Sequence, residues 1–162
     1  MTPRRREHAG TIRPETGFTM VELTIVLAIV AILAALASAA YGRYRDRVLV
    51  NQAVTDIGAI ATALKLHQND AREFPATLGE VGFDQKLDPW GRPYQYYNLE
   101  TRRGNGQARK DKKLAPLNSD FDLYSLGKDG QSKAPLVTPV SRDDVVRARD
   151  GRFIGLAKDF DP

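Results

Sequence analysis

The chain has 162 residues, a formal net charge of +4, 42% hydrophobic residues and no cysteine. This length leaves room for one modest domain plus an extended element, and the lack of cysteine excludes disulfides and cysteine-based metal sites. Half of the net positive charge lies in residues 1–17, which hold four arginines against two glutamates; the remainder carries 20 basic and 18 acidic residues. A nearly balanced domain has no general attraction to phosphate backbones, so we expect no nucleic-acid partner.

Residues 1–17 are basic, contain two prolines and lack apolar periodicity, which is typical of a cleaved targeting leader. Residues 18–40 are almost entirely Val, Ile, Leu and Ala, and Glu22 is their one charged side chain. About 20 helical residues cover the ~30 Å core of a bilayer, so this run predicts a single transmembrane span. Four arginines precede the span and three follow it, and this small excess favours a cytoplasmic N-terminus.

Residues 41–73 predict a continuation of the same helix, because no proline interrupts them and apolar residues recur at helical spacing. The predicted helix is therefore apolar all round in its first half and amphipathic in its second. Glu73 and Phe74 precede Pro75 and end the helix, since the residue before a proline avoids the α region. The expected apolar stripe consists of Val50, Val54, Ile57, Ala61 and Leu64, widened by Ile60.

Residues 74–162 are rich in turn signals and predict a small β-rich domain. Residues 93–99 and 121–126 predict two strands, and residues 153–156 form either a short third strand or a packed tail. The basic run at 102–113 is expected to be a solvated hairpin loop. A small antiparallel sheet cannot bury its apolar face alone, so we expect it to lie on the amphipathic half of the helix, giving an α+β fold.

The segment Gly17-Phe18-Thr19-Met20-Val21-Glu22-Leu23 resembles the processing site of type IV pilins and pseudopilins. The resemblance extends through the apolar run to about Tyr44. It implies a pilin-like fold, cleavage between Gly17 and Phe18 by a prepilin peptidase, and N-methylation of the new Phe18 amine.

Glu22 is expected to serve assembly, and this expectation has a physical basis apart from the resemblance. A carboxylate inside a membrane span costs up to about 2.5–3.5 kcal/mol on insertion scales and persists when it has a partner. No Lys, Arg or His lies near it within the span. Cleavage after Gly17 would create a cation at the same depth, the α-amine of Phe18, which an adjacent subunit could present to Glu22. Such a pair would set the register between helices.

Two downstream stretches, residues 87–96 (LDPWGRPYQY) and 122–130 (DLYSLGKDG), resemble the major pseudopilins of type II secretion. This resemblance implies a single-pass inner-membrane subunit with a periplasmic C-terminal domain. It also implies self-association into a helical filament that drives protein export, in contact with the inner-membrane secretion platform and with minor pseudopilins.

The same resemblance implies a calcium site in the loop after the second strand. Leu126 would offer its carbonyl and Asp129 its carboxylate, whereas the acidic loop that should follow is missing here. Asp143 and Asp144 are the next acids and could close the site, since calcium prefers oxygen ligands. Alternatively, Ser141 and Asp144 form a helix N-cap with an acid in the first turn.

Two other functions stay open. A true type IV pilus subunit would share every feature up to Tyr44. Ala37-Ser38-Ala39 also fits ordinary signal peptidase, which would release a soluble secreted domain beginning at Ala40.

We do not expect an enzyme. After processing, His67 is the one remaining histidine, and there is no cysteine nucleophile. Asp120 and Asp122 are close in sequence but lie on a predicted strand beside turn residues, with no apolar pocket implied, so we expect them to be solvated surface rather than a general acid/base pair.

Overall fold

The computed structural model describes residues 17–101 and 108–161 of a chain that divides into two compact units, Met1–Gly42 and Arg43–Pro162. One helix, α1, belongs to both units. The second unit adds a four-stranded antiparallel sheet in the order β1-β2-β3-β4. The main elements are α1 (Met20–Ala71), β1 (Gln95–Asn98), β2 (Phe121–Ser125), β3 (Val145–Ala148) and β4 (Phe153–Leu156). A helix followed by a small antiparallel sheet confirms the predicted α+β class.

The helix α1 ends where the sequence predicts. Its last residue is Ala71, and Arg72 adopts a left-handed conformation with φ 66°. The Arg72 N–H still donates to the Gln68 carbonyl at 2.8 Å, which closes the last turn. Phe74 and Pro75 then turn away and are buried, so the proline that forbids helix also anchors the chain against the core.

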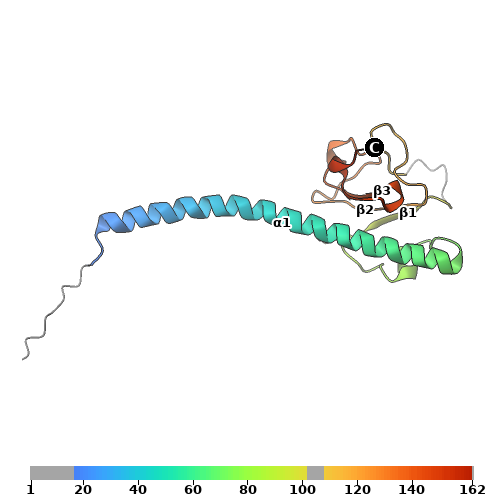
Figure 1. Ribbon diagram of the computed structural model, residues 1–162, viewed down its shortest axis with the longest axis horizontal. Coiled ribbons are helices and arrows are strands. Elements are labelled where there is room, and N and C mark those ends of the chain that lie inside the picture. The colour runs from blue at the N-terminus through green and yellow to red at the C-terminus, as the bar shows by residue number, and fades with distance from the viewer. Residues whose placement is uncertain (1–16, 102–107, 162) are drawn as a thin grey trace, which may run out of the picture. The chain divides into compact units, whose positions relative to one another are not determined.

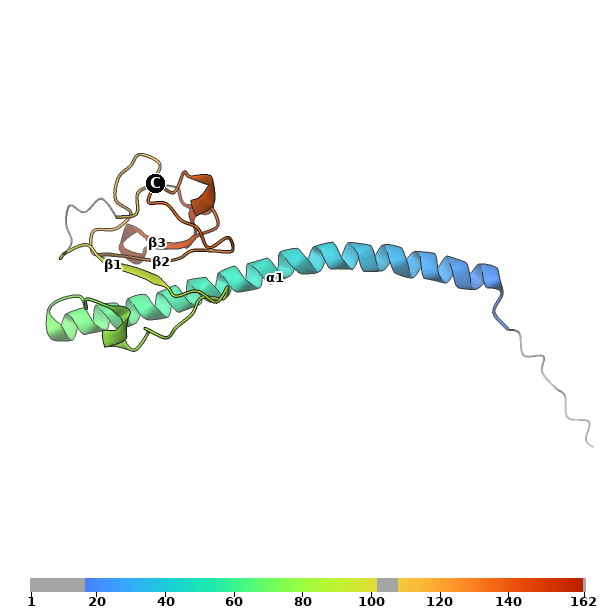
Figure 2. The ribbon, with the colours of Figure 1, turned by 180° about the vertical axis from the view of Figure 1, so that it is seen from behind.

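The sheet packs on the amphipathic half of α1, as the views from opposite sides in Figures 1 and 2 show. Ile57, Ile60 and Leu64 are fully buried and belong to the same apolar core as the sheet residues Phe121 and Leu123. Each large apolar side chain buried in this way contributes about 1.5–3 kcal/mol. The predicted stripe is confirmed, with its N-terminal members Val50 and Val54 only half-buried at the core edge.

The strands predicted at 93–99 and 121–126 correspond to β1 and β2, and residues 153–156 form β4 rather than a packed tail. The strand β3 was not predicted. All four of its residues, Val-Val-Arg-Ala, are buried, so the polar-apolar alternation that marks a half-exposed strand is absent. The helix N-cap expected at Ser141 is also wrong, because Ser141 ends a short 3-10 turn (Pro139–Ser141) and Asp144 leads directly into β3.

Arg147 on β3 is a fully buried arginine that reaches across to β2. Its Nη1 and Nη2 donate to the two Asp120 carboxylate oxygens at 2.8 and 2.7 Å, and Nη1 also donates to the Phe121 carbonyl at 3.0 Å. The guanidinium lies 4.0 Å from the centroid of the Phe121 ring. Burial raises the pKa of Asp120, but hydrogen bonds from Arg147 and from the Phe121 amide outweigh it, so the net pKa is lowered.

The prediction that Asp120 and Asp122 lie on the solvated surface is therefore wrong. Asp122 is 1% exposed, and its carboxylate accepts the Arg109 backbone N–H and the Asn118 side-chain amide. Asp120 is occupied by Arg147 and by Lys65, whose Nζ lies 3.2 Å away. Both carboxylates hold loops and strands together.

Replacing Arg147 by methionine should lower the free energy of unfolding by about 3–5 kcal/mol, because it leaves the half-buried Asp120 carboxylate without its bidentate partner. Urea denaturation of the full chain in detergent measures this loss. Arg152→Met is the matched control: Arg152 is exposed, and its removal should change stability by no more than about 0.5 kcal/mol. Equal urea midpoints for the two variants would contradict a stabilising role for the buried arginine.

Candidate functional site

The start of α1 holds Glu22 in a defined conformation. The backbone N–H and the hydroxyl of Thr19 both donate to Glu22 Oε2, at 2.8 and 2.9 Å. In return the Glu22 N–H donates to Thr19 Oγ1 at 3.2 Å. Thr19 therefore caps the helix, and Glu22 completes a reciprocal capping box in its first turn.

The sequence prediction for Glu22 missed this local partner. The signal was present, because Thr19 followed three residues later by Glu22 is the T-x-x-E pattern of a capping box. The bonds engage Oε2 alone; Oε1 accepts no hydrogen bond in the part of the chain that the structure describes. One carboxylate oxygen thus remains for a second partner.

The described part of the first unit beyond Glu22 is an apolar helical surface. Phe18 is 89% exposed, and large side chains such as Leu23, Val26 and Ile32 are more than half exposed on all sides of the helix. Within the described residues, α1 is long and apolar enough to cross a membrane by length and composition. Ala37-Ser38-Ala39 lies inside this helix, and the Ser38 hydroxyl donates to the Ala35 carbonyl.

The two downstream stretches that were singled out from the sequence dock on each other. Asp88 is buried and its Oδ1 accepts the N–H groups of Trp90 and Arg92, which closes the first turn. Its Oδ2 accepts the Ser125 hydroxyl at 2.5 Å, and Arg92 Nη1 donates to the Gly127 carbonyl at 2.7 Å. The turn at residues 88–92 therefore supports the loop that begins at the end of β2.

That connection, residues 126–144 between β2 and β3, contains all four predicted calcium ligands. Asp143 Oδ2 accepts the backbone N–H groups of Lys128 and Asp129 at 2.8 and 3.0 Å, and Asp129 Oδ1 accepts the Gln131 N–H. Gly127 adopts φ 65°, and a Cβ there would collide with the Asp143 carbonyl, so the loop requires glycine. Leu126 is the residue immediately before this glycine.

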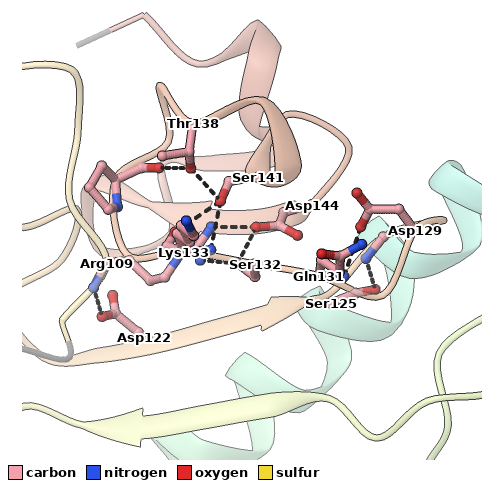
Figure 3. Close-up of polar contacts among 12 residues, drawn as sticks. Arg109, Asp122, Ser125, Asp129, Gln131, Ser132, Lys133, Thr138, Ser141 and Asp144 are labelled. Carbon is pink, nitrogen blue, oxygen red and sulfur yellow. Dashed lines mark hydrogen bonds and ion pairs between the residues drawn. The ribbon is translucent and has the colours of Figure 1, made fainter.

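Asp144, the fourth predicted ligand, is paired with an arginine (Figure 3). Arg109 Nη2 donates to Asp144 Oδ2 at 2.5 Å, and the Ser132 hydroxyl donates to the same oxygen. Arg109 Nη1 reaches the Ser132 hydroxyl and the Lys133 carbonyl. The Arg109 side chain is 3% exposed, so its predicted place in a solvated loop is wrong; residues 102–107 of that loop lie outside the described residues.

The donor set fits calcium only in part. The Leu126 carbonyl and the carboxylates of Asp129 and Asp143 belong to one loop and are oxygen donors of the kind calcium prefers. Asp144 is already neutralised by Arg109, and burial raises its pKa to about 6 against the opposing effects of Ser132 and Arg109. Among the described residues, no group of three or more acidic, histidine or cysteine side chains is placed to hold a metal. Calcium binding stays a prediction, resting on Leu126, Asp129 and Asp143.

Known proteins match both the N-terminal segment and the downstream domain of the chain. Residues 12–38 match the family described as the prokaryotic N-terminal methylation motif. A fimbrial protein of Neisseria meningitidis is 28% identical over 141 residues, covering 84% of this chain and 81% of that protein. The fimbrial match reflects a related superfamily. No solved structure matches the chain.

Other relatives carry a more specific name. The type II secretion system core protein G of Pseudomonas aeruginosa is 34% identical over 141 residues, covering 74% of this chain and 87% of that protein. The protein of the same name from Vibrio cholerae is 28% identical, covering 74% and 85%. The chain therefore belongs to the type II secretion system core protein G family and is a major pseudopilin.

Proposed function

We propose that prepilin peptidase cleaves this pseudopilin between Gly17 and Phe18, and that the mature subunit then polymerises through Glu22 into a filament that drives protein export. The observation that carries the proposal is the unused Oε1 of Glu22, on a helical surface that holds no other charge between Gly17 and Gly42. The Thr19 bonds fix the carboxylate through Oε2 and leave Oε1 without a hydrogen bond among the described residues.

The proposed partner is the methylated α-amine of Phe18 on an adjacent subunit. In lipid or between packed helices, an unpaired carboxylate is costly, and pairing it with a cation at the same depth removes that cost. The pair forms only when two helices are aligned at one axial offset. Glu22 thereby determines the register of the filament, while the surrounding Leu, Ile and Val side chains supply contact area.

We further propose that the subunit waits in the inner membrane with its N-terminus in the cytoplasm and residues 74–162 in the periplasm. The excess of arginine before the span supports this orientation. The secretion platform and the minor pseudopilins are the proposed partners there. No catalytic role is proposed, because the relatives are structural proteins and Asp120 and Asp122 are both engaged in the fold.

Mass spectrometry of the mature chain tests the processing step. The expected N-terminus is N-methylated Phe18, and Gly17→Ala should leave the precursor uncleaved. A mature chain that begins at Ala40 would show release by ordinary signal peptidase and would end the assembly proposal.

Glu22→Gln should weaken subunit addition at least about tenfold, which corresponds to a loss of at least ~1.4 kcal/mol per added subunit, and should lower the yield of sheared filaments accordingly. Glutamine can still accept the Thr19 bonds, so this variant removes the charge and keeps the cap. Thr19→Val does the reverse and should assemble far better than Glu22→Gln. Glu73→Gln, an exposed acid outside the span, is the control; wild-type filament yields from Glu22→Gln would leave the pairing without a role.

Calcium at the loop after β2 is a separate proposal, supported by the oxygen donors of Leu126, Asp129 and Asp143. Calcium bound there would join β2 to the segment before β3, a function that a disulfide cannot serve in this chain. Addition of calcium should raise the Tm of the full chain in detergent, and a calcium chelator should reverse the rise.

Asp129→Asn should abolish this calcium response, whereas Asp84→Asn, on the exposed surface, should keep it. A Tm that is the same in calcium and in chelator would remove the calcium proposal and leave the assembly proposal untouched.

A further inference from the structure

A cleft of about 230 Å³ opens in the second unit between α1 and the loops at the end of the sheet. Its apolar lining comes from Val50 on α1, Trp90 and Leu156. Three basic side chains, Lys128, Arg142 and Lys158, line it as well. The cleft thus combines an apolar surface with several cations, which is the chemistry that suits an amphipathic anion.

The two acids of the cleft are already engaged. The Asp46 carboxylate lies 3.0 Å from Lys128 Nζ, and Asp143 accepts two backbone N–H groups of the loop after β2. Arg142 and Lys158 are exposed, and neither forms an ion pair within the described residues. Two cations beside the cleft therefore lack a counter-charge.

The cationic surface continues along α1. Residues three and four apart share a helix face, so Arg43 and Arg47 lie on the face that presents Asp46 and Val50 to the cleft. Both arginines are exposed and make no ion pair in the part of the chain that the structure describes. We call Arg43, Arg47, Lys128, Arg142 and Lys158 the basic collar.

The chain itself keeps this collar near the membrane surface. Asp46 follows Ala40, the last residue of the apolar run, by six residues. Six residues span about 9 Å as helix and no more than about 20 Å when fully extended. The headgroup layer begins where the apolar run ends and is roughly 5–8 Å thick. Arginines just outside the span also oppose the usual preference for basic residues on the cytoplasmic side, so their position calls for another cause.

We propose that the basic collar and its cleft bind the headgroups of anionic phospholipids on the outer face of the membrane, and so hold the globular unit against the bilayer until the subunit enters the filament. The proposal rests on the membrane span proposed above. The cations attract the phosphate groups, and the apolar lining of Val50, Trp90 and Leu156 receives the glycerol and upper acyl carbons. Extraction from the membrane then breaks these contacts.

Trp90 is the one tryptophan of the chain and lines the cleft, so it reports directly on lipid contact. The full mature chain is placed, one copy per disc, in nanodiscs of phosphatidylcholine with and without phosphatidylglycerol. Both disc types contain a trace of phosphatidylcholine with a nitroxide on its headgroup. Quenching of Trp90 should be stronger in the phosphatidylglycerol discs. Raising the ionic strength from 0.1 to 1 M should remove the difference, because it shortens the Debye length from about 10 Å to about 3 Å.

The double variant Arg142→Gln/Lys158→Gln should lose the difference between the discs. The control Arg72→Gln/Arg152→Gln removes the same charge from exposed arginines outside the cleft and should keep the difference between the discs.

Quenching that is equal in both disc types, or unchanged in the cleft variant, would overturn the proposal. Protection of Trp90 from quenching that requires several copies per disc, and that occurs without anionic lipid, would also overturn the proposal. The cleft would then bind a second subunit and not a lipid. A chain that enters neither type of disc contradicts the span itself, whereas insertion without quenching contradicts the lipid site alone.

Discussion

Two buried guanidinium groups connect the segments of a domain that has short strands and no disulfide. Arg147 links β3 to the start of β2 through Asp120, and Arg109 links the connection before β2 to the connection after it through Asp144 and Ser132. Each guanidinium also lies over an aromatic ring of β2, at 4.0 Å from Phe121 and 4.4 Å from Tyr124. Buried charges are tolerated only when their partners are in place, so these networks specify one arrangement of the loops around the sheet.

The arginine pairs also affect how much a metal can add. A bound calcium ion would neutralise carboxylates and join the two ends of the loop between β2 and β3. For Asp144, Arg109 already neutralises the carboxylate. The loop is further tied by Asp143, whose carboxylate closes the turn at Lys128 and Asp129. The chain thus holds this region with hydrogen bonds and an organic cation, and calcium would act at the outer part of the loop around Asp129.

The sequence was most informative where local pattern determines structure. The length of α1, its apolar stripe and strands β1 and β2 follow from periodicity and proline position, which are properties of neighbouring residues. The strand β3 and the burial of Arg109 could not be predicted in this way, because each depends on partners far along the chain. Arg109 stands in a basic run that is typical of a solvated loop, and only Asp144, 35 residues later, makes its burial possible. The Thr19–Glu22 capping box was a local signal and could have been found.

The exposed apolar half of α1 gives a physical reason why a single carboxylate could decide assembly, as proposed for Glu22. None of the described residues covers this surface, so lipid or other copies of the helix would have to bury it. Lipid tails are as apolar as leucine side chains, and moving the helix from one to the other gains little from the hydrophobic effect. The energy that distinguishes the two environments must then come from groups that lipid cannot satisfy. Within the proposed span that group is Glu22, whose Oε1 no hydrogen bond within the described chain engages. In the proposed filament, specificity would therefore depend on the one side chain that a membrane helix would otherwise avoid.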